Sequence, residues 1–76
     1  MLFQRNWEKV KVGDKVKAKK DVPALMEHAI QFDKDEEATI VVVKEDHIGI
    51  IDRYKDVAGF NKRKSLTGDF VGDWFK

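Results

Sequence analysis

The sequence contains no cysteine, a single proline and a single serine, Ser65. Without cysteine there is no disulfide, and without a Cys/His cluster no thiolate metal site helps the chain to fold. One serine outside any G-x-S-x-G context leaves no nucleophile with an oriented base. The longest apolar run, residues 40–43, is far too short to span a bilayer, and the start has no apolar run of signal-peptide length. We therefore expect a cytoplasmic protein without catalytic residues, cofactor, metal site or membrane partner.

An excess of charge of one sign is also missing. Fifteen lysines and arginines face fourteen aspartates and glutamates, and the net charge is +1. No global positive field therefore indicates a nucleic-acid binder, and any basic site must be local.

Size limits the core. Seventy-six residues make one domain, residues 1–76, and a chain of this length hides only about 60% of the surface that its unfolded form exposes. The core must therefore be thin, and we expect no pocket for a small-molecule substrate. The mix of 42% hydrophobic and 38% charged residues is typical of a folded domain. Residues 1–8 are expected to form a loose N-terminal arm.

The apolar residues recur mostly at alternate positions or in short β-branched runs, which is typical of strands. In residues 14–20, Val16 and Ala18 fall on one face of a strand, and Lys15, Lys17 and Lys19 fall on the other. Residues 37–44 give the strongest strand prediction, and residues 47–52 are expected to pair with them as a hairpin, with another backbone close to Gly49.

The remaining segments are predicted from weaker patterns. Residues 22–30, interrupted by Pro23, are expected to form a long loop with room for a short helical turn. A brief strand around Val57 and a closing strand over residues 68–76 complete the chain. Five short strands in so short a chain must curl to bury a common interior, so we expect an all-β protein with a small five-stranded barrel.

Two stretches resemble Src-homology 3 (SH3) domains. Ala24 and Leu25 followed by residues 30–43, I-Q-F-D-K-D-E-E-A-T-I-V-V-V, are similar to the family's A-L-Y-D-Y loop and L-x-F-x-x-G-D-x-I-x-V-V strand. Residues 68–75, G-D-F-V-G-D-W-F, are similar to its ending G-L-F-P-S-N-Y-V. The resemblance implies an SH3-like barrel. It does not imply recognition of proline-rich peptides, because most of the aromatic shelf that holds a polyproline II ligand is absent and only Trp74 keeps that chemistry.

Two hypotheses for function follow. In the first, the chain is a small protein-binding module or accessory subunit that contacts its partner through Trp74, Tyr54 and the acidic residues Asp33, Asp35 and Glu36. In the alternative, it binds nucleic acid through a lysine-rich strand face and a basic loop, with the residues Lys15, Lys17, Lys19, Lys62, Arg63 and Lys64. A purely structural subunit is a third reading.

The aromatic residues near the two ends of the chain also have two readings. Trp7, Trp74 and Phe75 form either an exposed patch for a protein partner or a plug that fills the open end of the barrel.

Overall fold

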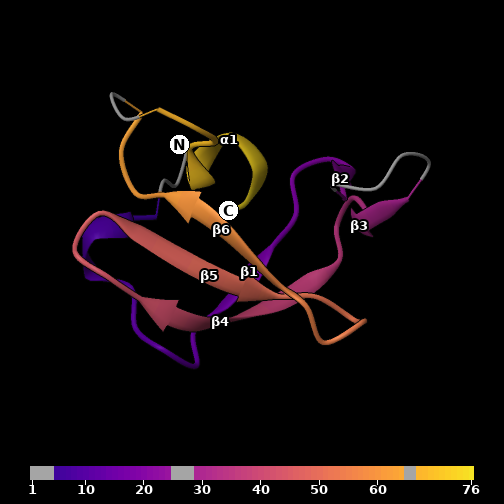
Figure 1. Cartoon of the computed structure of the whole chain (residues 1–76), viewed down its shortest axis with the longest axis horizontal. Helices are drawn as coiled ribbons and strands as arrows, with labels where there is room; N and C mark the ends of the chain where they lie inside the picture. Colours follow the sequence, from indigo (N-terminus) through magenta and orange to yellow (C-terminus); the bar gives the residue numbers. More distant parts are fainter. Residues whose placement is uncertain (1–4, 25–28, 65–66) are drawn as a thin grey trace.

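The structure, a computed structural model, describes residues 5–24, 29–64 and 67–76. Its elements in chain order are η1 (Trp7–Lys9), β1 (Lys15–Lys17), β2 (Val22–Pro23), β3 (Ile30–Phe32), β4 (Glu37–Val43), β5 (His47–Ile51), β6 (Val57–Asn61) and α1 (Val71–Trp74) (Figure 1). The expected mostly β composition is confirmed. In these ranges no helix is long and apolar enough to cross a membrane.

The strands form two antiparallel sheets. The larger has the order β1-β4-β5-β6, and the smaller pairs β2 with β3. Val16 is buried in β1 while Lys15 and Lys17 are exposed on either side of it, as the alternation predicted. The hairpin of β4 and β5 is likewise where the sequence placed it, with a register shift between Ile40 and Val42.

The segment expected to be a long loop, residues 22–30, begins and ends in strands instead. Val22 pairs with Phe32, and Pro23 pairs with Ile30 across a register shift. Pro23 is tolerated because β2 is an edge strand. Among the described residues its outer edge pairs with no other strand, so the missing N–H of proline costs no hydrogen bond there. The helical turn considered for this segment falls on residues 25–28, which lie outside the described ranges.

The closing strand predicted for residues 68–76 is wrong over Val71–Trp74, which form the helical turn α1. Single bridges flank the turn, joining Phe70 to β6 and Phe75 to Ala18. At the end of the chain, Lys76 and Lys17 exchange two backbone hydrogen bonds of 2.9 and 3.0 Å. The last residues therefore lie beside β1, on the side away from β4 (Figure 1).

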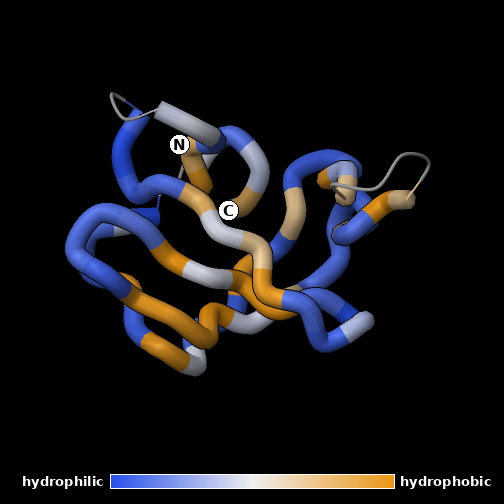
Figure 2. Tube along the Cα trace, in the orientation of Figure 1, coloured by the Kyte–Doolittle hydropathy of each residue, from blue (hydrophilic) through white to orange (hydrophobic). Residues whose placement is uncertain are grey.

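The core is small and centred on three phenylalanines. Phe75 is fully buried and packs edge-to-face against Phe32 and Phe60, with ring centroids 5.1 and 5.3 Å apart. The central strands β4 and β5 contribute several of the other apolar residues of the core (Figure 2). Trp7 is also buried, whereas Trp74 is half-buried at the edge of the core. Trp7 and Phe75 therefore belong to the core and do not form an exposed patch.

The expected loose arm over residues 1–8 is wrong from Arg5 onward. Trp7 packs into the core, and Arg5 donates a 2.9 Å hydrogen bond to the carbonyl oxygen of Lys15. Asn6 caps η1 by accepting a hydrogen bond from the N–H of Glu8. The carboxylate of Glu8 in turn lies 2.8 Å from the guanidinium of Arg63. The buried indole of Trp7 and the polar contacts of its neighbours hold this segment to the sheet. Residues 1–4 lie outside the described ranges.

Candidate functional site

A groove of about 500 Å³ lies between the two sheets. One wall comes from β2 and the residue after it, and the other from β6 and the residue before it. Its lining residues are Val22, Pro23, Ala24, Gln31, Asp52, Asp56, Val57, Ala58, Gly59, Phe60, Asp69 and Trp74. Figure 1 shows the β2–β3 sheet set apart from β6, on its right. The volume is in the range of about 300–1,000 Å³ that is usual for ligand-binding clefts.

The walls of the groove are largely apolar and partly open to solvent. Val57 is 50% exposed, so much of its side chain is open to solvent at the groove. Gly59, two residues on, lies on the same edge of β6 and is also exposed. Beneath them, Phe60 is buried and joins the groove to the core. An apolar side chain of a partner would therefore meet apolar surface here.

Trp74, the residue that the sequence favoured most as a contact, lines this groove. It is the last residue of α1 and is half-buried against the core. The ammonium group of Lys20 lies 4.3 Å from the centroid of its ring, a cation–π arrangement. The indole is thus held in place and keeps one part of its surface at the groove.

Three carboxylates give the groove its charge. Asp52 is only 7% exposed; its Oδ1 accepts hydrogen bonds from the N–H groups of Tyr54 and Asp56, and its Oδ2 accepts one from Gln31. Burial alone would raise the pKa of Asp52, but these hydrogen bonds outweigh it and hold the pKa below its usual range. Asp56 and Asp69 are exposed, and no lysine or arginine is among the described lining residues. The groove therefore carries negative charge at neutral pH.

The predicted acidic contact residues form a turn that a single arginine ties down. Arg53 donates to Asp33 at 2.8 Å, to Glu36 at 2.6 Å and to the carbonyl oxygen of Ile30 at 3.1 Å. Asp35 adopts a positive φ of 70° at the tip and is exposed. This turn lies outside the groove, and much of its charge is already balanced.

Tyr54 is close to the acidic turn. It is 61% exposed, and its ring centroid lies 5.0 Å from the guanidinium carbon of Arg53. Arg53 therefore brings Tyr54 and the acidic turn together, whereas Trp74 belongs to the groove. The structure divides the predicted protein-contact residues between two places.

The predicted basic residues do not form one open cluster. Lys62 is only 8% exposed, Arg63 pairs with Glu8, and the ammonium of Lys64 lies 3.8 Å from Asp73. Lys15, on β1, donates to Thr39 at 2.6 Å, and Lys17 is exposed beside it.

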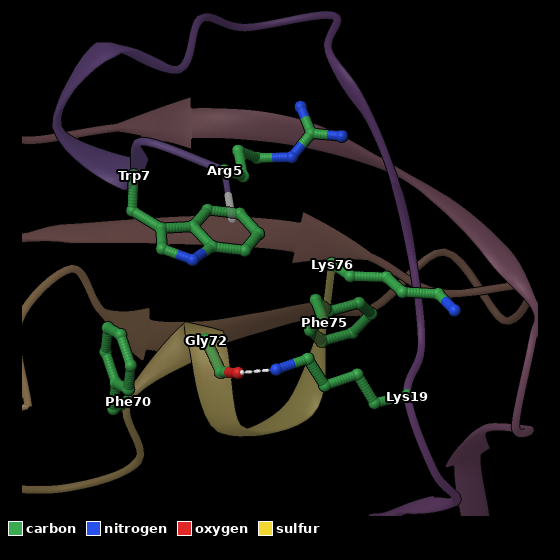
Figure 3. A pocket seen from close by; sticks show the side chains of 7 residues that line it. All are labelled: Arg5, Trp7, Lys19, Phe70, Gly72, Phe75 and Lys76. Atoms are coloured by element: carbon green, nitrogen blue, oxygen red, sulfur yellow. Dashed lines mark hydrogen bonds between the residues drawn. The ribbon is translucent and has the colours of Figure 1, made fainter. Parts of the chain in front are cut away.

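Lys19 lines a second, smaller cavity of about 160 Å³ (Figure 3). The cavity also has Arg5, Trp7 and Lys76 in its walls. The ammonium of Lys19 donates to the carbonyl oxygen of Gly72 at 2.5 Å, and Arg5 donates to a backbone carbonyl of β1. Two of its cations thus hold the N-terminal segment and α1 against the sheet, which is a structural role.

Sequence reasoning missed most of the groove. Its strongest local signals are Pro23, which marks an edge strand, and the V-A-G-F pattern of β6, which places Val57 and Gly59 on one edge. Asp56 and Asp69 are exposed residues of the loops that precede β6 and α1, and no pattern in the sequence distinguishes them. Only the folded chain brings these separate segments together.

Neither a search of the described residues for metal ligands nor comparison with known proteins identifies another site. No group of three potential metal ligands occurs among the residues that the structure describes. Comparison of the chain with protein-family models, curated proteins and solved structures finds no match. Function is therefore inferred from the groove.

Proposed function

We propose that the chain is a small, non-catalytic protein-binding module that holds a segment of a partner protein in the groove between β2 and β6. The observation that carries this proposal is the combination of an apolar cleft of about 500 Å³ with Trp74 in its wall and three aspartates, one buried and two exposed, among its lining residues. Tryptophan is among the residues most enriched at the energetic centres of protein interfaces. Exposed Val57 adds apolar surface that is buried only when a partner is present.

The size of the groove favours a short segment and modest affinity. A cleft of this volume receives a few residues, and its contact area falls well below the roughly 1,600 Å² of a standard protein interface. We therefore expect dissociation constants on the order of micromolar, which is equivalent to about −8 kcal/mol. Tyr54 and the acidic turn lie outside the groove and are proposed as a secondary contact for a longer partner.

We also propose that the fold is an SH3-like barrel of five strands. The order of the elements supports this, because a long excursion separates β1 from a three-stranded meander, and a helical turn precedes the end of the chain. The pairing of Lys76 with Lys17 further supports it by returning the chain end to β1. In the proposed barrel the groove marks the gap between β6 and the β2–β3 sheet.

The nucleic-acid alternative has less support. The loop of residues 62–64 contributes one buried lysine and two cations with acidic partners. Phosphate binding needs cations on a shared open surface, and in the described part of the chain Lys15 and Lys17 are the exposed members of the predicted set that lie side by side on β1.

The proposal is tested by selecting binders from a random peptide library on the intact chain and measuring their affinity for two variants. Val57→Lys changes a groove residue that is 50% exposed, whereas Val12→Lys changes a valine that is 64% exposed and does not line the groove. We expect Val57→Lys to weaken binding tenfold or more and Val12→Lys to leave it unchanged. Circular dichroism spectra establish that both variants are folded. Equal affinities for both folded variants would contradict the proposal.

A further inference from the structure

Strand β6 has one edge paired with β5 and one edge facing the groove. At its end, the N–H of Asn61 points outward and donates to the carbonyl oxygen of Asp69 at 2.8 Å, while the next N–H, that of Lys62, points inward to Asp46. Backbone groups alternate in direction along an antiparallel strand. The N–H and C=O groups of Val57 and Gly59 therefore point outward like those of Asn61. Among the described residues, no backbone or side-chain group pairs with them.

This outward edge has the form of a strand-addition site. Val57 and Gly59 both line the groove and are exposed. The facing wall contains Pro23, which has no N–H and cannot pair there. An added strand lies about 4.8 Å from its neighbour, so its backbone would run along β6 while its side chains meet Val22 and Trp74.

The available edge is short. The N–H of Asn61 is already taken by Asp69, and Phe70 bridges to the same residue. The edge open to a partner thus extends over Val57–Gly59, room for about three or four residues at about 3.4 Å each. Short edges of this kind are used in peptide recognition by strand addition, where main-chain hydrogen bonds give affinity and side-chain pockets give specificity.

Charge identifies the kind of segment. Asp56 directly precedes the open edge, and Asp69 lies at its far end through its bond to Asn61. Asp52 adds a buried negative charge beside Asp56. With no cation among the described lining residues, a basic partner is electrostatically matched to both ends of the edge and an acidic one is repelled.

We infer that the groove binds an extended, lysine- or arginine-containing segment of a partner protein, which adds as a strand to the outer edge of β6 and directs its basic side chains to Asp56 and Asp69. This inference rests on the proposed function and specifies its partner. Strand addition uses the backbone groups of Val57 and Gly59, so it requires free N–H and C=O groups on the partner's backbone. Side-chain packing alone has no such requirement.

The test uses a nine-residue peptide of alternating lysine and valine with blocked ends, together with three matched peptides. One carries N-methyl groups on the valine amides, one on the lysine amides, and one has glutamate in place of lysine. Because alternate amides of a strand face one neighbour, we expect one methylated peptide to bind the intact chain at least tenfold more weakly and the other to bind within threefold of the parent. The glutamate peptide should bind at least tenfold more weakly.

The same titrations are repeated with protein variants and by NMR. Asp56→Asn combined with Asp69→Asn should weaken binding of the parent peptide about tenfold and reduce its salt dependence. Glu45→Gln, which changes an exposed carboxylate between β4 and β5 that does not line the groove, should leave both unchanged. Bound peptide should slow hydrogen exchange of the Val57 and Gly59 amides. The inference is overturned if the parent peptide does not bind, if the two methylated peptides bind equally, or if these amides stay unprotected. Library-selected peptides that depend on Val57 would in that case leave the proposed function standing.

Discussion

Gly49 offers a sharp test of the packing around the groove. It lies in β5, opposite Val42 on one side and Gly59 on the other. A Cβ atom at Gly49 would lie 2.7 Å from Cγ1 of Val57 and 3.0 Å from Cβ of Val42. Carbon atoms without a bond between them prefer separations of about 3.5–4.0 Å. The Cβ of Val42 is fixed to its backbone, so Gly49→Ala must push β4 and β5 apart, at a cost of about 1–3 kcal/mol.

Gly59→Ala is the matched control, since this residue pairs directly with Gly49. No heavy atom lies within 4 Å of a Cβ built there. The substitution should be neutral or stabilising by less than about 1 kcal/mol, because alanine lowers the entropy of the unfolded chain. The two alanines thus test packing at neighbouring sites with the same chemistry.

Thermal unfolding followed by circular dichroism measures both variants. A domain of this size has a free energy of unfolding of roughly 4–11 kcal/mol at about 0.05–0.15 kcal/mol per residue. A loss of about 2 kcal/mol shifts Tm by about 8–16 °C in a domain of this length. We expect Gly49→Ala to lower Tm by that amount and Gly59→Ala to leave Tm unchanged or raise it by less than about 8 °C. Equal Tm values would refute the close approach of β4, β5 and Val57.

Three further predictions concern the core, the buried carboxylate and the surface. Phe75→Ala should cost about 3–5 kcal/mol in urea unfolding and Phe75→Leu clearly less, because only the former empties the site between the two other phenylalanines; equal costs would contradict this. The pKa of Asp52 is lower folded than unfolded, so its stabilisation is present above about pH 4 and is lost as pH falls through the folded pKa. The stability difference between the wild type and Asp52→Asn should therefore shrink below pH 4, and a difference independent of pH would count against it. Labelled oligonucleotides should bind weakly at low salt and equally to the wild type and to Lys62→Ala, since that lysine is buried. Weaker oligonucleotide binding by Lys62→Ala alone would favour the nucleic-acid hypothesis.

The strands that the sequence predicted well are those with a local signal. Alternation of valine and alanine with lysine located β1, and a β-branched run located β4. The β2–β3 pair was missed because both strands are short and Pro23 usually interrupts a strand. The turn α1 was predicted as part of a strand because aromatic residues are typical of strands. At Gly72 a Cβ atom would lie 2.6 Å from the ring of Phe70, two residues earlier, and 3.1 Å from Nε1 of Trp7, which is distant in the sequence.

The candidate site was predicted only in part, for a related reason. Trp74 was identified from its place in the ending of the chain, and it lines the groove. The state of the charged residues depends on partners far away in the sequence: Arg53 reaches the acidic turn, and Glu8 reaches Arg63 across 55 positions. Periodicity and composition carry no signal for such pairs, so charges that looked open from the sequence are balanced in the fold.

The central claim, that partners bind in the groove between β2 and β6, is tested most directly by an NMR titration. The ¹⁵N-labelled chain is titrated with a library-selected peptide, and amide and indole shifts are followed. We predict that the largest changes fall on Val57, Gly59 and the Trp74 indole, with small changes at the acidic turn of Asp33 and Glu36. Changes confined to the acidic turn or to the lysines of β1, with the groove signals unmoved, would contradict the claim.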